Sequence, residues 1–223
     1  MRNFLAVKRI ALFIFLFAGL TLRAQTFVEP DLAKLFASGS IKTYNRTATL
    51  TESGERKNGI HLDEKPNAGI AWLDEIEFSE GTIEFDLKGR NMLQKSFVGI
   101  AFHGVDDKTY DGIYFRPFNF KALEMERKNH SVQYISLPAN DWPKLRKEFP
   151  DQYEKPVSPV PEPEEWFHAT IMITGKEVKV FVDHSAEPSL VVQQLSNQNG
   201  GKIGFWVGAD SSGDFANLKI SKK

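Results

Sequence analysis

The chain has no cysteine. It can form neither a disulfide nor a thiolate nucleophile, and the absence argues against a lipid anchor attached to a cysteine. Three motifs are also missing: the G-x-S-x-G nucleophile turn, a glycine-rich phosphate loop, and an H-x-H or H-x-x-x-H pair. No sequence signature therefore supports a serine hydrolase, a nucleotide site or a histidine-based metal site.

Long apolar runs are scarce, and the longest lies near the N-terminus. Residues 10–20, IALFIFLFAGL, follow a basic start and precede Ala24, a small residue at a plausible cleavage point. This layout is typical of a secretory signal peptide, and the run is short for a membrane span. We therefore predict a signal peptide over residues 1–24 and a periplasmic or secreted protein. An uncleaved N-terminal anchor is the alternative.

Excess positive charge is absent as well. The full chain has a net charge of −1, and removing the four basic residues of the leader leaves −5. A mildly acidic chain argues against nucleic acid or an anionic membrane as a partner once the leader is cleaved. Residues 25–223 are enough for one domain with a substantial core. The oligomeric state is not indicated.

Period-two alternation dominates what is present. In GTIEFDLKG, residues 81–89, Ile83, Phe85 and Leu87 lie on one side and polar residues on the other. Such alternation is typical of half-buried strands. It recurs over residues 47–53, 58–64, 68–74, 96–104, 109–117, 130–136, 167–175, 176–183, 201–208 and 213–221. The pattern predicts an all-β jelly-roll sandwich of two antiparallel sheets.

Residues 137–165 interrupt this pattern. Asp141 and Pro143 suit the start of one short helix, and four prolines follow from Pro156 onward. Proline-rich chain favours an extended conformation without internal hydrogen bonds. Because the segment has aromatic residues to dock with, we predict an ordered flap lying against the sandwich. A disordered insert is the alternative.

Strand parity separates the core from the outer face. Val98, Ile100 and Phe102 share one parity and are predicted to point inward, which leaves glycine and alanine on the outer side. Trp206 lies between two glycines on the outer parity, so we expect an exposed aromatic plate. The predicted outer cleft carries hydrogen-bonding groups and rings that suit a sugar. Its members are His103, Tyr114, Arg116, Trp206, Glu84 and Asp86. Alternatively, the flap covers Trp206 and Tyr114.

Arg116 is the most distinctive of these residues. Pro117 cannot donate to a sheet, so it marks a strand end or bulge and brings Asn119 to the cleft rim. The guanidinium has donors for vicinal hydroxyls or a carboxylate. The alternative is an ion pair with a nearby acid. The candidate partners are Glu84, Asp86 and Asp111.

Histidines and loop carboxylates supply the remaining candidates. His103 suits a general base, a ligand contact or a plain polar surface residue, and His130 is a further ligand contact. A His103–His130 pair with Asp111 or Asp210 could hold a divalent metal. Calcium is an alternative, and solvated loop acids are the other. The calcium candidates are Asp106, Asp107 and Asp210. We expect no cofactor apart from this calcium candidate.

The order of these segments resembles the concanavalin A-like lectin/glucanase superfamily, close to laminin-G-type domains. The resemblance rests on EWFHATIMITGKEVKVFVDH, residues 165–184, and GKIGFWVGADSSGDFANLKIS, residues 201–221. It covers roughly residues 45–221. Within the superfamily the chain is similar to the 3-keto-disaccharide hydrolase domain family, in its G-x-I-G strand, its FANLKI strand and Arg116. The family's LFNG…GW opening is replaced by SGSIKTYNRTATLTESG.

The resemblance implies an exported protein that binds or processes carbohydrate on its outer sheet face. The first alternative is a glycoside hydrolase or lyase, with His103 as base and Arg116 holding an oxyanion. The second is a non-catalytic module that binds another protein.

Overall fold

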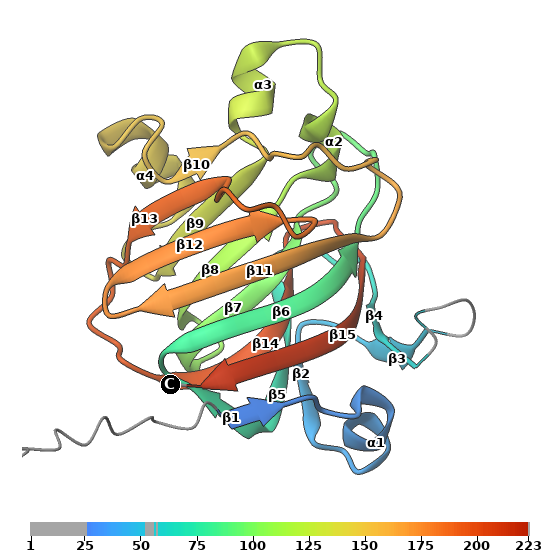
Figure 1. The fold of residues 1–223 in the computed structure, drawn as a ribbon. Helices are drawn as coiled ribbons and strands as arrows, with labels where there is room; N and C mark the ends of the chain where they lie inside the picture. The colour runs from blue at the N-terminus through green and yellow to red at the C-terminus, as the bar shows by residue number, and fades with distance from the viewer. Residues whose placement is uncertain (1–25, 52–55, 57, 223) are drawn as a thin grey trace, which may run out of the picture.

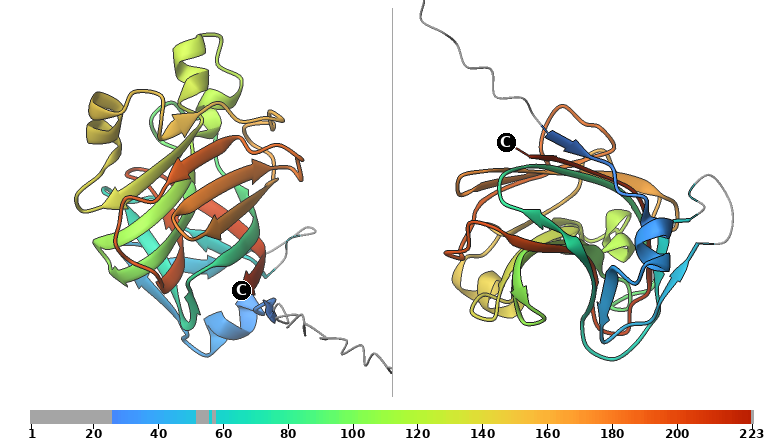
Figure 2. Two further views of the ribbon diagram at one scale, coloured as in Figure 1. Left: turned by 60° about the vertical axis from the view of Figure 1, so that its left-hand side comes forward. Right: turned by 90° about the horizontal axis from the view of Figure 1, so that it is seen from below.

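Two antiparallel sheets stacked as layers form the body of the computed structural model, which describes residues 26–51, 56 and 58–222 (Figures 1 and 2). The predicted signal peptide lies outside these residues. The predicted all-β jelly-roll sandwich is confirmed. No helix in the described part of the chain is long and apolar enough to cross a membrane.

Sheet A combines strands from the N-terminal, central and C-terminal parts of the chain. In spatial order it contains β13 (Leu190–Gln193), β12 (Glu177–Val182), β11 (Phe167–Thr174), β6 (Gly81–Lys88), β15 (Gly213–Lys222), β4 (Ile60–Leu62) and β3 (Ala48–Leu50). β1 (Thr26–Val28) also pairs with β15.

Sheet B carries the strands for which an outer cleft was predicted. In spatial order it contains β10 (Glu154–Lys155), β9 (Val132–Leu137), β8 (Thr109–Phe115), β7 (Val98–Asp106), β14 (Gly201–Val207), β5 (Gly69–Phe78) and β2 (Ile41–Tyr44). β8, β7 and β14 are therefore neighbours in one sheet, which is the condition on which the predicted cleft depended.

The core lies between the sheets, at the positions that parity assigned to it. Phe205 of β14 packs against Phe85 of β6 and Phe215 of β15, with ring centroids 6.3 and 4.7 Å apart. Val98 and Ile100 are fully buried on the same side of sheet B. Alternation therefore identified the apolar face of these strands correctly.

The predicted helix in the 137–165 segment is confirmed as α4 (Trp142–Glu148). The Asp141 carboxylate caps it by accepting a hydrogen bond from the Trp142 amide at 2.7 Å, and Pro143 lies in its first turn. After α4, Tyr153 packs on Tyr134 of β9 with 5.7 Å between ring centroids, and the chain adds β10 to the edge of sheet B.

Further short helices form that the sequence did not predict. They are α1 (Leu32–Ala37), α2 (Pro117–Phe120) and α3 (Met125–Asn129). Segments of four to six residues are too short for a helical period to be read. α2, α3, α4 and β10 gather at one end of the sandwich, whereas α1 and the C-terminus lie at the other (Figures 1 and 2).

Candidate functional site

The outer face of sheet B has an aromatic floor built across three strands. Tyr114 and Trp206 both pair with Gly99, which lies between them, and their rings meet above it with centroids 4.9 Å apart. A Cβ atom on Gly99 would lie 2.0 Å from the Ile113 carbonyl oxygen, so this close packing requires glycine.

This floor is buried, which corrects the predicted exposed plate. Trp206 is 7% exposed and Tyr114 is 2% exposed. The Trp206 indole donates to the Tyr110 hydroxyl at 2.9 Å, and Tyr110 packs edge-on against Trp72. Burial raises the pKa of both Tyr110 and Tyr114 to about 12, so both hydroxyls stay neutral.

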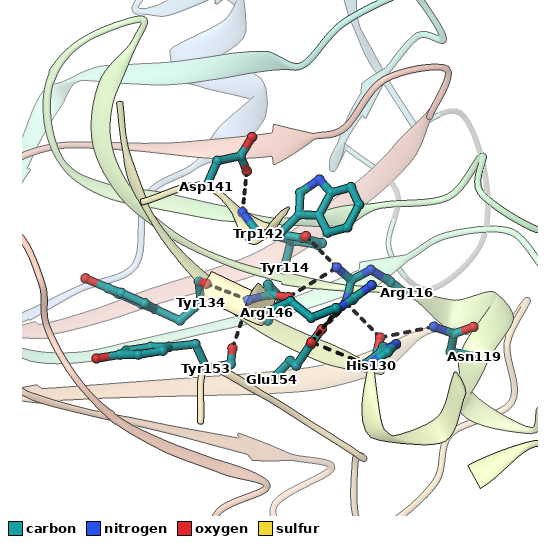
Figure 3. Close-up of polar contacts among 11 residues, drawn as sticks. Tyr114, Arg116, Asn119, His130, Tyr134, Asp141, Trp142, Arg146, Tyr153 and Glu154 are labelled. Atoms are coloured by element: carbon teal, nitrogen blue, oxygen red, sulfur yellow. Dashed lines mark hydrogen bonds and ion pairs between the residues drawn. The ribbon is translucent and has the colours of Figure 1, made fainter. Parts of the chain in front are cut away.

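Arg116 lies beside this floor and is itself buried (Figure 3). Its Nη2 donates to the Tyr114 hydroxyl at 2.7 Å and to Gln133 Oε1 at 3.2 Å. Its Nη1 donates to the His130 carbonyl at 2.9 Å and to Glu154 Oε2 at 3.5 Å. The terminal nitrogens are thus fully engaged, and Arg116 holds Tyr114 and the neighbouring strand in place.

Glu154 is the ion-pair partner, and the sequence did not predict it. Its carboxylate, 2% exposed, accepts two hydrogen bonds of 2.6 Å from Arg146 and lies 3.4 Å from the His130 ring. The bidentate pair raises the pKa of Arg146. Burial is the largest influence on His130 and lowers its pKa despite the attraction of Glu154. The prediction that Arg116 pairs with one of three acids is wrong in its candidates, which were Glu84, Asp86 and Asp111.

The role of Glu154 could not be predicted from the sequence, because the residue lies in the segment that interrupts the strand pattern. β10 places Glu154 opposite Gln133 of β9, and Gln133 in turn lies opposite Tyr114 of β8. A single acid before a run of prolines carries no signal by itself. Only the folding of the 137–165 segment onto the edge of sheet B brings Glu154 to Arg116.

Two cavities adjoin above this floor. One, of about 530 Å³, is lined at its polar end by Arg116, Asn119, Arg127, His130 and Arg146. The other, of about 390 Å³, is lined by Tyr114 and Trp206. Phe97 and Trp142 line both cavities. We name the combined space the Arg116 groove, defined by Phe97, Tyr114, Arg116, Arg127, Trp142 and Trp206.

Trp142 is the accessible aromatic residue of the groove. It lies at the start of α4, it is 41% exposed, and the Arg146 guanidinium stacks over its ring at 4.9 Å. Leu93 and Gln94 line the 530 Å³ cavity from the loop before β7. The sequence assigned the aromatic contact to Trp206, whereas the fold buries Trp206 and exposes Trp142.

His103 does not line the groove, which corrects its predicted place. The pairing of β7 with β8 shifts between Phe102 and Asp106, and His103 adopts a φ of +51° at this bulge. The bulge turns the ring away from the regular alternation. The ring is 1% exposed, with Nε2 2.7 Å from the Ser79 carbonyl and Nδ1 3.5 Å from Asp111.

Glu84 and Asp86 are also elsewhere, because β6 belongs to sheet A and their side chains lie on that sheet's outer face. Asp86 contacts His168 at 2.8 Å and Arg56 at 3.1 Å, and it accepts a hydrogen bond from Asn217 at 2.7 Å. The structure therefore separates these two acids from the groove by the thickness of the sandwich.

The metal candidates do not come together. His130 lies with Glu154, whereas His103 lies with Asp111, so the proposed histidine pair does not form. Asp107 accepts the Trp72 indole hydrogen bond at 2.8 Å. Within the described residues, no group of three or more histidine and acidic side chains could hold a metal ion.

Comparisons with known proteins identify the fold. No protein-family model matches the chain, and no curated protein does. Among solved structures, the carbohydrate binding module CBM66 from Bacillus subtilis is 15% identical with a TM-score of 0.55, covering 81% of this chain and 95% of that one. The fold is that of a lectin-like β-sandwich. The predicted concanavalin A-like architecture is therefore confirmed.

Two further structures agree with it. A protein of unknown function with a galectin-like fold from Bacillus subtilis has a TM-score of 0.56 at 12% identity, covering 89% of this chain and 100% of that one. The exoplasmic/lumenal domain of VIP36, in its Ca²⁺/Man3GlcNAc-bound form, has a TM-score of 0.53 at 9% identity, covering 81% and 83%. At these identities the likeness extends to the fold alone.

Proposed function

We propose that this protein binds a saccharide in the Arg116 groove. The observation that carries the proposal is the position of Trp142, an exposed indole at the junction of two cavities. A sugar ring has an apolar C–H face that packs on an aromatic ring, and hydroxyls that need hydrogen-bonding groups at its edge. Trp142 offers the first, and Asn119, Arg127 and Arg146 offer the second.

The size of the groove and the nature of the structural neighbours support the proposal. Cavities of about 530 and 390 Å³ lie within the range of small-ligand sites, roughly 300–1,000 Å³. One neighbour is a carbohydrate binding module, and another is a domain with a bound oligosaccharide. The prediction of export fits such a role and stays a prediction.

We favour binding over catalysis. The hydrolase and lyase alternative assigned the base to His103, and that ring lies outside the groove against Ser79 and Asp111. Among the described residues that line the groove, Asp141 is the one carboxylate, and it caps α4, whereas a glycosidase of the usual kind needs a pair of carboxyl groups. A saccharide-binding module needs neither group.

The test compares two tryptophans that each carry a stacked arginine. Trp142 pairs with Arg146, and Trp166, which lines neither cavity, has Arg56 at 5.5 Å from its ring. A panel of neutral and acidic oligosaccharides is screened, and the ligands that bind are titrated by calorimetry. We expect Trp142→Ala to weaken binding by about tenfold or more, and Trp166→Ala to leave it unchanged.

Two outcomes contradict the proposal. Equal affinities of wild type and Trp142→Ala, for ligands that wild type binds, would place the site elsewhere. If wild type binds no saccharide of the panel, the proposal of saccharide binding itself is contradicted. Thermal unfolding of both variants controls for loss of the fold, which we do not expect at Trp142 because its side chain is already 41% exposed.

A further inference from the structure

The two ends of the Arg116 groove differ in charge. The 530 Å³ cavity is lined by Arg116, Arg127, Arg146 and His130, and none of the described residues that line it is acidic. Among the described residues that line the 390 Å³ cavity, none is basic and the one charged residue is Asp141, which caps α4. A ligand that spans the groove therefore meets one cationic end and one aromatic, nearly neutral end.

At the cationic end, the arginines that line the cavity outnumber the carboxylates buried beneath it. Glu154 is the buried carboxylate there, and it is shared by Arg116, Arg146 and the His130 ring. Two guanidinium groups thus face one carboxylate. Arg127 adds a third positive charge. Glu124, 63% exposed, lies 3.4 Å from Arg127, and Glu126 of α3 attracts Arg146 and His130, but neither glutamate lines the cavity.

Hydrogen-bond donors remain available at this end. Arg146 contacts Glu154 through Nε and Nη2, which leaves Nη1 without a partner among the described residues. Arg127 donates through Nε to Asn119 at 3.3 Å and through Nη2 to the Phe118 carbonyl at 2.7 Å, and its side chain is 37% exposed. Guanidinium donors that line a cavity without a lining carboxylate suit a carboxylate or sulfate oxygen of a ligand.

We propose that the ligand is an acidic saccharide that places its anionic group against Arg127 and Arg146. Its neighbouring uncharged ring would then lie on Trp142, toward the cavity lined by Tyr114 and Trp206. This inference rests on the proposed saccharide binding, because it assigns the chemical class of the ligand in the same groove. Both carboxylates and sulfate esters have the required chemistry, and the experiment separates them.

The test uses matched probes that differ in the anionic group. Oligosaccharides prepared from hyaluronan, in which acidic and neutral rings alternate, are titrated before and after reduction of their carboxyl groups, and those from κ-carrageenan, which carries sulfate but no carboxylate, before and after desulfation. We expect the acidic form of at least one probe to bind at least about tenfold more tightly than its neutral counterpart. Binding should weaken as salt is raised, because the interaction between charges is screened.

Arginine variants locate the effect. Arg127→Gln is expected to weaken binding of the acidic form by about 10- to 100-fold and to leave binding of the neutral form unchanged. Arg127→Lys, which keeps the charge, is expected to retain part of the affinity. The matched control is Arg56→Gln, on the outer face of sheet A, which should change neither form.

The outcomes distinguish this inference from the proposed function. If neutral forms bind as tightly as acidic forms and Trp142→Ala abolishes binding, the inference of an acidic ligand is wrong. The proposal of saccharide binding then stands. Acidic binding that Arg127→Gln leaves intact, or that Arg56→Gln abolishes, would overturn the assigned site. Absence of binding by all forms would overturn both proposals together.

Discussion

Two buried carboxylates, one on the outer face of each sheet, have similar partners but different surroundings. Glu154 on sheet B contacts two arginines and a histidine, and Asp86 on sheet A contacts Arg56, His168 and an asparagine. The first cluster underlies the cavity of about 530 Å³, whereas Asp86 lines neither cavity of the groove.

The difference has two physical causes. On sheet B the outward position between Tyr114 and Trp206 is Gly99, so the two rings meet over the middle strand and no third side chain rises between them. The 137–165 segment then supplies a wall, with Trp142 at its edge. On sheet A the outward residues, such as Met172 at 39% exposed, stand in solvent. A site thus needs a missing side chain on the floor and a segment that rises beside it.

Replacing each carboxylate by the corresponding amide should give the largest difference in stability between the two clusters. In Glu154→Gln, Arg116 stays buried with 5% of its side chain exposed and loses its countercharge, and we expect a loss of about 3–5 kcal/mol in the free energy of unfolding. Asp86→Asn should cost less, about 1.5–3 kcal/mol, because Arg56 is 28% exposed and can turn toward water.

Urea unfolding of both variants measures these values. Equal losses would mean that the two clusters are energetically equivalent and that the burial of Arg116 has no special cost. A nearly neutral Glu154→Gln would contradict our account of the groove floor.

Adding one methyl group to the floor is the next test. Gly99→Ala places a Cβ atom 2.0 Å from the Ile113 carbonyl oxygen, which is backbone and cannot move aside cheaply. We expect a loss of stability of about 1–3 kcal/mol and a disturbed contact between Tyr114 and Trp206, measured by thermal unfolding and near-UV circular dichroism.

Gly112→Ala is the matched control on the adjacent strand. Its nearest neighbour would be the Ile135 Cγ1 atom at 3.3 Å, a side-chain atom that can shift. We expect it to be closer to neutral. If Gly112→Ala destabilised the protein as much as Gly99→Ala, the glycine beneath the two rings would have no special role.

The smallest expected effect is a change of stability with pH that arises from the Asp86 cluster on sheet A. Burial alone would raise the pKa of Asp86, but hydrogen bonds from His168 and Asn217 and the charge of Arg56 outweigh it, and the pKa is lowered. A lowered carboxyl pKa stabilises the fold above the unfolded-state value of about 3.9 and loses that contribution as pH falls through the folded value.

The stability difference between wild type and Asp86→Asn should therefore shrink as pH falls below about 4. Urea unfolding at a series of pH values from 7 to 2 measures the difference. A difference that grew as pH fell below about 4 would have the wrong sign and would contradict the linkage.

Sequence reasoning succeeded where the cause is local. Alternation identified the inward residues of β7, β8 and β14, and Asp141 with Pro143 marked the start of α4. Tyr114, Arg116, Asn119 and His130, which were predicted as ligand contacts, line the groove, and their contact with a ligand stays a prediction. Sequence reasoning was wrong about His103, because one bulge reverses the parity of a strand, and such a shift leaves no mark in the alternation.

The sequence by itself determined that this protein is a β-sandwich and which side of each strand is apolar, because hydrophobic alternation acts residue by residue. The tertiary structure alone decided which strands share a sheet, and so separated Glu84 and Asp86 from Arg116. It also brought Glu154 to Arg116 across 38 positions of sequence. Contacts between distant segments depend on the packing of the whole chain, and no local pattern encodes them.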